Sequence, residues 1–289
     1  MPERGGQPSD TPGLTALLAE LRAAATAAGR RDFLITMATA ADPAGYSGLD
    51  LAGLHPSVDF FNLMTYDYHG SWEKSVNYHT PWVDTREGGT HGIQNTLDHY
   101  IKNGTVPPFK ITLGLGLYGK SWTLDHEKKT KVGSPASLPG AAGACTGERG
   151  REGASARAPA WGHCLESLDA TRILPVHQLM RHPLPLLPSP PPGAPGTLSW
   201  REIEALIAGG AKVNVDSTAM AAYLVQGDQW VSFDAPETIF MKIKAARAAG
   251  MGGTMVWAAD YDTADHSMLT IIAWARANPE AATETLRMR

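Results

Sequence analysis

Short apolar runs alternate with helical segments along most of the chain, and this alternation limits the fold more than any other feature. Four runs have the length and composition of buried strands: Asp32 to Ala40, Phe60 to Asp67, Lys110 to Tyr118 and Gly252 to Asp260. Strands that are apolar on both faces and separated by helices form parallel sheets covered by helices. The sequence therefore predicts an α/β fold, either doubly wound or a closed eight-stranded barrel. Four strands alone cannot close such a barrel.

Helix signals lie between these runs. Asp10 or Thr11 followed by Pro12 predicts a helix start, and leucines at helical spacing continue until Gly29 offers a stop. Further helices are predicted around Ile93 to Asn103, over Ala235 to Ala249 and over Thr263 to Ala277.

A long excursion separates the third strand from its helix. It covers roughly Ser121 to Phe233, which is too long for an ordinary loop and predicts an inserted subdomain. Its end alternates polar and apolar residues around Gly227 and Asp228, as in an antiparallel hairpin. Its middle, residues 151–195, lacks periodicity and has seven prolines between Pro183 and Pro195. We expect this segment to be disordered or foreign to the fold.

Composition excludes several classes of function. The net charge is −4, the pI is near 6.2, and no run of Lys or Arg occurs, so nucleic acid and anionic membrane surfaces are not expected partners. Cys145 and Cys164 are too few for a disulfide framework, although one bridge stays open. The N-terminus is polar and rich in Gly and Pro, and no apolar run has about 18 residues. The chain as given is therefore expected to encode neither a signal peptide nor a membrane span.

Aromatic and sparse charged residues follow three strands where a parallel sheet forms its ligand sites. The residues at these strand ends are Tyr66, Asp67, Tyr68, Tyr118, Lys120, Trp122, Trp257 and Asp260. Flat indole and phenol faces cover the apolar faces of sugar rings, while carboxylate and phenol groups bind hydroxyls or amides. Each aromatic residue alone could simply cap the core, and Asp67 could cap a loop. Their coincidence at three strand ends favours a sugar-binding surface.

The sequence offers no metal or cofactor signal. His69 and His79 flank the loop after the second strand, but the ten histidines show no H-x-x-x-H or comparable ligand spacing. We therefore expect neither a metal nor a cofactor.

Four segments resemble glycoside hydrolase family 18, the chitinases and chitinase-like lectins. "FFNLMTYDYHGSWE", "LGLGLYGKSWTL", "GTLSWREI" and "GGTMVWAADYD" resemble the sixth strand, the seventh strand, the inserted subdomain and the eighth strand of that family. The resemblance covers Pro2 to about Gly150 and Gly196 to about Asn278. It implies the C-terminal half, strands five to eight, of a (β/α)8 TIM barrel with an α+β insertion. The barrel parts would be residues 1–120 and 234–278, the insertion 121–233, and the tail 279–289.

The resemblance also assigns a site. Tyr66 and Asp67 would position the acetamido group of the N-acetylglucosamine to be cleaved, Trp257 would be the floor on which that sugar stacks, and Trp72 would stack the sugar on the leaving-group side. Lys120 stands where the family usually has Arg, so bidentate contacts are not expected there. The implied substrate-binding set is Met64, Tyr66, Asp67, Tyr68, Trp72, Tyr118, Lys120 and Trp257.

One essential element of the family is absent from the sequence. Family 18 enzymes hydrolyse β-1,4 N-acetylglucosamine linkages with retention, through the substrate's own acetamido group, and need a general acid Glu in a D-x-x-D-x-D-x-E motif. The chain lacks this motif and is expected to begin just after it, with Pro2 matching a Pro that follows the Glu. Glu73 and Asp260 are not placed to replace the acid.

Three functions remain open at this point. The chain is a truncated chitinase that is inactive as given, a non-catalytic binder of chitin or its oligosaccharides, or an unrelated α/β enzyme. The resemblance implies an extracellular location and chitin or N-acetylglucosamine oligosaccharides as ligands. A half-barrel would also have open sheet edges, through which we expect self-association.

Overall fold

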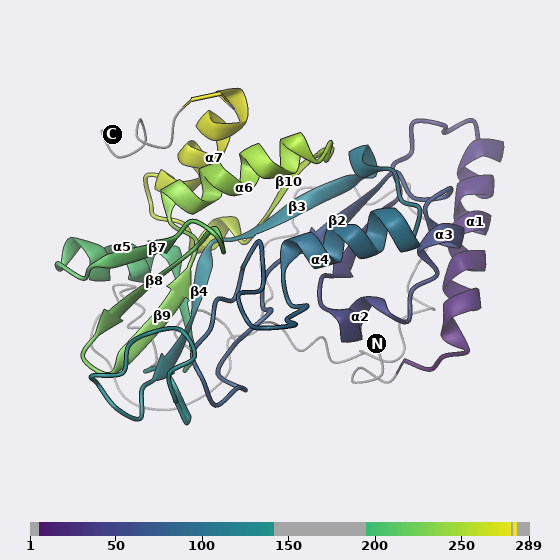
Figure 1. The fold of residues 1–289 in the computed structure, drawn as a ribbon. Helices are drawn as coiled ribbons and strands as arrows, with labels where there is room; N and C mark the ends of the chain where they lie inside the picture. The colour runs from purple at the N-terminus through teal and green to yellow at the C-terminus, as the bar shows by residue number, and fades with distance from the viewer. Residues whose placement is uncertain (1–5, 142–194, 279, 282–289) are drawn as a thin grey trace, which may run out of the picture.

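The computed structural model describes residues 6–141, 195–278 and 280–281, which form two β-sheets with helices packed on them (Figure 1). The first sheet is parallel and has the order β1-β2-β3-β10. Its strands are β1 (Thr36–Ala40), β2 (Phe60–Met64), β3 (Ile111–Gly116) and β10 (Gly253–Trp257). The predicted α/β class is therefore confirmed, and each predicted apolar run contains one of these parallel strands.

Burial is greatest in the middle of the parallel sheet. Leu63 of β2 pairs in register with Leu113 of β3, and both side chains have no exposed surface. β3 is buried along nearly its whole length, as expected for a strand covered on both faces. β1 and β10 are more exposed, and each pairs with one strand only among the described residues. They are the edges of this sheet.

The helices follow the predicted positions with one shift. The helices that accompany the parallel sheet are α1 (Asp10–Ala27), α2 (Pro43–Tyr46), α3 (Leu51–Leu54), α4 (Ile93–Asp98), a π-helical continuation (His99–Asn103), a 3₁₀ turn (Pro108–Lys110), α6 (Pro236–Ala248), a second 3₁₀ turn (Ala259–Tyr261) and α7 (Ser267–Ala277). α6 contacts β3 and β10 and packs against α7 (Figure 1). α7 begins four residues later than expected from Thr263, because Asp262 and Thr263 bond the first N–H groups of the helix instead of joining it.

The second sheet is antiparallel and has the order β5-β4-β9-β8-β7, with β6 paired to β4. Its elements are β4 (Tyr118–Thr123), β5 (Leu138–Pro139), β6 (Thr197–Ser199), α5 (Trp200–Ala208), β7 (Val213–Asp216), β8 (Ala221–Gln226) and β9 (Gln229–Phe233). The hairpin predicted around Gly227 and Asp228 is confirmed as β8 and β9. The run predicted as one strand from Lys110 to Tyr118 is instead divided after Gly116, and the chain then enters the second sheet.

Two glycines bring the ends of a long segment together beside β4. The Gly196 N–H donates to the carbonyl oxygen of Gly140 at 2.9 Å, and the Gly140 N–H donates to the carbonyl oxygen of Ser121. Apart from Pro195, the segment 151–195 lies outside the described residues. Gly140 and Gly196 are therefore held next to each other beside β4.

Candidate functional site

The chain makes a sharp change of direction where β2 ends. The Thr65 hydroxyl donates to the carbonyl oxygen of Gly114 on β3 at 2.6 Å. The two strands are so close that a Cβ on Gly114 would lie 2.1 Å from the Leu63 carbonyl oxygen. Asp67 follows with φ of 61°, in the left-handed region that Asp tolerates better than most residues. The Asp67 carboxylate is thereby carried off the strand on a backbone fixed by β3.

Two donors from β4 meet one oxygen of that carboxylate. The Tyr118 hydroxyl donates to Asp67 Oδ1 at 2.8 Å, and Lys120 Nζ lies 3.3 Å from the same atom. The Lys120 side chain is 3% exposed, whereas that of Asp67 is 29% exposed. A buried cation and a phenol therefore hold an acid that solvent, and hence a ligand, can reach.

Tyrosines form one side of the site. The ring centroids of Tyr66 and Tyr118 lie 5.8 Å apart with an interplanar angle of 69°, and Tyr118 meets Tyr261 edge to face at 6.1 Å. Burial first, and then the charge of Asp67, raise the pKa of Tyr66 and of Tyr118 above the ordinary tyrosine value. These phenols are therefore protonated hydrogen-bond donors at neutral pH.

Two indoles remain exposed near this cluster. Trp72 is 62% exposed and Trp257, the last residue of β10, is 45% exposed. Lys120 Nζ lies 5.6 Å from the centroid of the Trp72 ring. The Leu117 N–H donates to the Trp257 carbonyl oxygen at 2.8 Å, which places Trp257 beside the start of β4. The peptide bond from Trp257 to Ala258 is cis. Large exposed aromatic faces beside a carboxylate suit a ligand with alternating apolar and polar faces.

The structure does not bring every expected residue to this surface. Tyr66, Asp67, Trp72, Tyr118 and Lys120 are linked by the contacts above, and Met64 is half-buried at the end of β2.

Tyr68 and Trp122 lie in the core instead. The Tyr68 hydroxyl lies 2.7 Å from Thr96 Oγ1, and its ring is 3% exposed. Trp122 has no exposed surface and packs edge to face on Trp230. Both were expected at the site because they follow strand ends, but the positive φ of Asp67 and the pairing of β4 with β9 turn their side chains inward.

His79 and Tyr261 are site residues that sequence reasoning did not select. His79 has no exposed surface, its Nδ1 lies 4.0 Å from Asp67 Oδ1, and its ring centroid lies 5.2 Å from that of Tyr118. Burial first, and then the charges of Lys120 and Lys242, hold the pKa of His79 well below the usual histidine value. The imidazole is therefore neutral. A signal for Tyr261 was present, since it lies within the "GGTMVWAADYD" segment.

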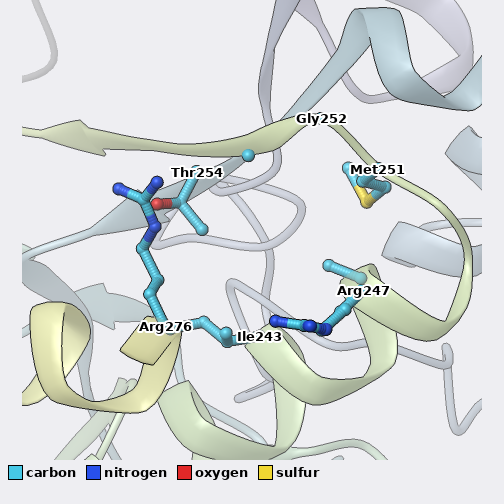
Figure 2. Close-up of a pocket in the computed structure, with 8 residues that line it drawn as sticks. Ile243, Arg247, Met251, Gly252, Thr254 and Arg276 are labelled. Carbon is cyan, nitrogen blue, oxygen red and sulfur yellow. The ribbon is translucent and has the colours of Figure 1, made fainter. Parts of the chain in front are cut away.

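A separate recess lies at the other end of β10. It has a volume of about 190 Å³ and is lined by Arg247 and Arg276, from α6 and α7, together with Thr254 (Figure 2). It adjoins the first residues of β10, whereas Trp257 is the last, and about 3.3 Å separates successive residues of a strand. The arginine-lined recess is therefore not part of the Asp67 surface.

The described part of the chain contains neither a candidate metal cluster nor a candidate membrane span. No group of three or more His, Cys, Asp or Glu side chains in it could hold a metal ion. None of its helices is both long and apolar enough to cross a bilayer.

Comparisons of sequence and of structure identify relatives of the same family. Residues 3–262 match the family described as glycosyl hydrolases family 18. An endochitinase of Brugia malayi is 30% identical over 243 residues, which cover 82% of this chain and 39% of that protein. The crystal structure of the Ostrinia furnacalis Group II chitinase catalytic domain 2 is 26% identical, with a TM-score of 0.72, over 96% of this chain and 63% of that one. A mutant of the same domain in complex with (NAG)5 is 27% identical, with a TM-score of 0.72, over 96% of this chain and 62% of that one. The chain thus spans less than two thirds of each of these proteins.

Proposed function

Because the chain belongs to glycosyl hydrolase family 18, we propose that the Asp67 surface binds chitin through its N-acetylglucosamine units. The observation that carries the proposal is the reachable Asp67 carboxylate, held by Tyr118 and Lys120 beside two exposed indoles. An acetamido group offers one N–H donor and one carbonyl acceptor. Asp67 accepts from the former, and the protonated phenol of Tyr66 donates to the latter.

The indoles supply the apolar part of the recognition. Trp257 is the floor for the sugar whose acetamido group meets Asp67, and Trp72 stacks the next sugar on the leaving-group side. The relative solved with (NAG)5 supports a sugar ligand of this class. Tyr118 and Lys120 serve by holding Asp67, and Met64 completes the wall at the end of β2.

We further propose that this surface is the substrate-binding half of a chitinase site. In substrate-assisted hydrolysis, the acetamido carbonyl oxygen forms a bond to the anomeric carbon while the glycosidic bond breaks and an acid protonates the leaving oxygen. Asp67 stabilises the positive charge that develops on the acetamido nitrogen, and water later restores the amide. The protonating acid belongs to the D-x-x-D-x-D-x-E motif, which the sequence does not contain. We therefore propose that the chain as given binds chitin without turning it over.

The parallel sheet fits this proposal. We propose that β1, β2, β3 and β10 correspond to strands five to eight of a (β/α)8 barrel and that the antiparallel sheet is the insertion after the seventh. The support is the low burial of the two edge strands, β1 and β10. Self-association through these edges and an extracellular location stay predictions.

The test compares two ligands of equal length. Tryptophan fluorescence is titrated with chitopentaose and with cellopentaose, which lacks the acetamido groups. We expect chitopentaose to bind at least about tenfold more tightly, since a lost hydrogen bond to a charged group costs about 1.5–3 kcal/mol. Equal affinity for both sugars would contradict an acetamido site. Release of a fluorogenic leaving group from chitobioside by the pure chain would contradict the absence of turnover.

A further inference from the structure

Trp72 stands on a tight turn whose two ends are tied together. The Glu73 N–H donates to the Gly70 carbonyl oxygen at 2.9 Å, which closes the turn in the backbone. The His69 imidazole lies 2.8 and 3.0 Å from the two Glu73 carboxylate oxygens, which closes it again through side chains. The His69 side chain is only 1% exposed. The exposed indole is therefore carried by a turn that is anchored in the core.

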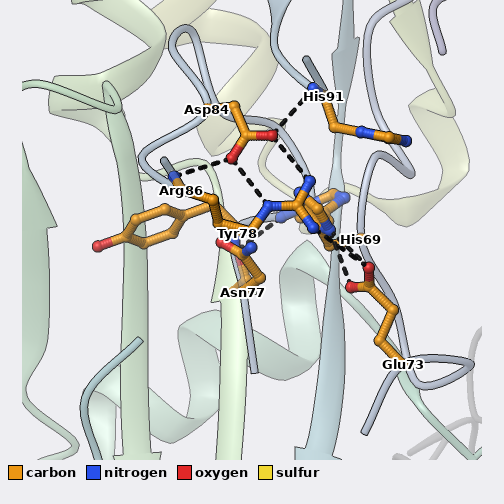
Figure 3. Close-up of polar contacts among 9 residues, drawn as sticks. His69, Glu73, Asn77, Tyr78, Asp84, Arg86 and His91 are labelled. Atoms are coloured by element: carbon orange, nitrogen blue, oxygen red, sulfur yellow. Dashed lines mark hydrogen bonds and ion pairs between the residues drawn. The ribbon is translucent and has the colours of Figure 1, made fainter. Parts of the chain in front are cut away.

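Glu73 has a second support, from Arg86 (Figure 3). Arg86 Nη1 lies 3.8 Å from Glu73 Oε1, and Arg86 donates two further bonds to Asp84, at 2.7 and 3.0 Å. Asp84 also accepts the backbone N–H groups of Arg86 and His91. Burial opposes ionisation of Asp84, but these donors hold its pKa at about 2. Glu73 is thus held from two sides by groups that are themselves fixed.

The indole has two contacts of its own. A Cβ on Gly70 would lie 2.2 Å from the benzo ring of Trp72, so the ring rests on the glycine backbone and leaves no space for a methyl group. Lys120 Nζ, 5.6 Å from the ring centroid, is within the range of a cation–π interaction. The same ammonium group pairs with Asp67. The orientation of Trp72 is therefore coupled to the acid that we assign to the acetamido group.

We propose that Glu73 is a positioning residue that fixes Trp72 in its sugar-stacking orientation before ligand binds. The inference rests on the proposed function. Glu73 acts through Trp72 and touches no sugar. His69 and Arg86 hold Glu73, and the Trp72 ring packs directly on the Gly70 backbone. Ordering one large side chain in advance improves affinity by about two- to tenfold, because that entropy is no longer lost on binding.

A double-mutant cycle tests whether Glu73 acts through Trp72. Chitopentaose affinity is measured for the wild type, Glu73→Ala, Trp72→Ala and the double variant. We expect Glu73→Ala to weaken binding about two- to tenfold and to have no further effect once Trp72 is removed. An equal loss in both backgrounds would overturn the proposal. Glu87→Ala, an exposed acid in the same segment with no ion pair among the described residues, is the matched control and should bind like the wild type.

A second measurement needs no sugar and separates this inference from the proposed function. The protein is labelled with 5-fluorotryptophan, and the ¹⁹F signal of Trp72 is identified by its loss in Trp72→Phe. We expect one narrow Trp72 signal that broadens or shifts in Glu73→Ala and in Gly70→Ala. The matched control is Gly48→Ala, because a Cβ there meets no atom within 4 Å.

The outcomes of the two experiments are distinct. The Trp72 signal could respond to these changes while the protein binds no chitopentaose. That result would contradict only the proposed function. An unchanged Trp72 signal in Glu73→Ala would overturn the inference, whatever the result for Gly70→Ala. If Glu73→Ala does not fold, Glu73→Gln, which keeps one acceptor for His69, carries the test and should show a smaller loss of affinity and a smaller change in the Trp72 signal.

Discussion

Two Asp–Lys pairs in this molecule have the same chemistry and opposite surroundings. Asp67 and Lys120 lie 3.3 Å apart beside the exposed indoles, with side-chain exposures of 29% and 3%. Asp234 and Lys242 lie 2.5 Å apart where β9 leads into α6, with exposures of 2% and 1%. The first pair therefore has one acid that a ligand can reach, whereas the second is sealed. Exposure of the acid, and not the presence of an ion pair, separates the proposed binding site from the scaffold here.

The partners of each pair agree with this distinction. Asp234 Oδ1 also accepts the Thr238 hydroxyl at 2.7 Å, so its bonds are directed to the first turns of α6. Burial lowers the pKa of Lys242 against the opposing charge of Asp234. Asp67 instead meets the Tyr118 hydroxyl and Lys120, both on β4. The Asp234 pair fastens α6 to the chain that leaves β9, and the Asp67 pair holds a carboxylate at the surface that we propose binds sugar.

The largest expected effect comes from breaking the sealed pair. Lys242→Met leaves the Asp234 carboxylate buried without its cation, which should lower the free energy of unfolding by about 3–5 kcal/mol. Chemical denaturation measures the change. Lys244→Met is the control on the same helix, since Lys244 is exposed, and it should change stability by less than about 0.5 kcal/mol. Equal losses of stability in the two variants would contradict the structural importance of the buried Asp234–Lys242 pair.

Asp67→Asn should weaken ligand binding more than it lowers stability, in contrast to Lys242→Met. Asparagine keeps an acceptor for Tyr118 but loses the charge, so chitopentaose affinity should fall about 10- to 100-fold. Stability should fall by only about 1–2 kcal/mol, because asparagine still offers Lys120 an acceptor oxygen and the Asp67 side chain is 29% exposed to water. Calorimetric titration and thermal melting give the two numbers. A larger loss of stability than in Lys242→Met would show that Asp67 is mainly structural.

Asp84 extends the comparison to acid pH. Its folded-state pKa of about 2 lies below the ordinary value of 3.8, so its contribution to stability is complete above about pH 4 and disappears as the pH falls toward 2. Asp84→Asn should remove about 2 kcal/mol at pH 6 and almost nothing at pH 2, because one pKa unit corresponds to about 1.4 kcal/mol. Denaturation at both pH values checks this. Parallel acid profiles for the wild type and the variant would contradict the assigned role of Arg86.

The smallest effect is expected from removing residues 151–195. Deleting residues 151–195 should leave stability within about 1 kcal/mol, because Gly140 and Gly196 are already hydrogen-bonded and loop length contributes only weakly to stability. Thermal melting compares the two chains. Loss of folding on deletion would show that the segment is structural, as the Asp234–Lys242 pair is.

Sequence patterns predicted the parts of the fold that local physics determines. Apolar runs predicted the parallel strands, Pro12 predicted the start of α1, and Gly227 predicted the hairpin. They did not predict the break after Gly116, because the run stays apolar while the chain passes from one sheet to the other. That passage depends on pairing with β9, which is distant in sequence.

The site was predicted less completely, for geometric reasons. Simple alternation would place Tyr66 and Tyr68 on one side, but the positive φ of Asp67 interrupts it and Tyr68 enters the core. A lysine at a strand end is expected to be exposed, yet Lys120 lies against the rings of Trp72 and Tyr118. His79 reaches Asp67 only through the folding of a long loop. Contacts of this kind depend on tertiary structure.

The position of β4 also has a consequence for how fast the protein folds. Lys120 on β4 contacts Thr197 across 77 residues of sequence, whereas β8 and β9 are joined by a two-residue turn. The hairpin can therefore form within microseconds, whereas the contact between Lys120 and Thr197 waits for a long loop to close. Shortening that loop to about 30 residues should speed closure about fourfold. The order of assembly would then place the Asp67 surface, which includes Lys120, among the last parts of the chain to form.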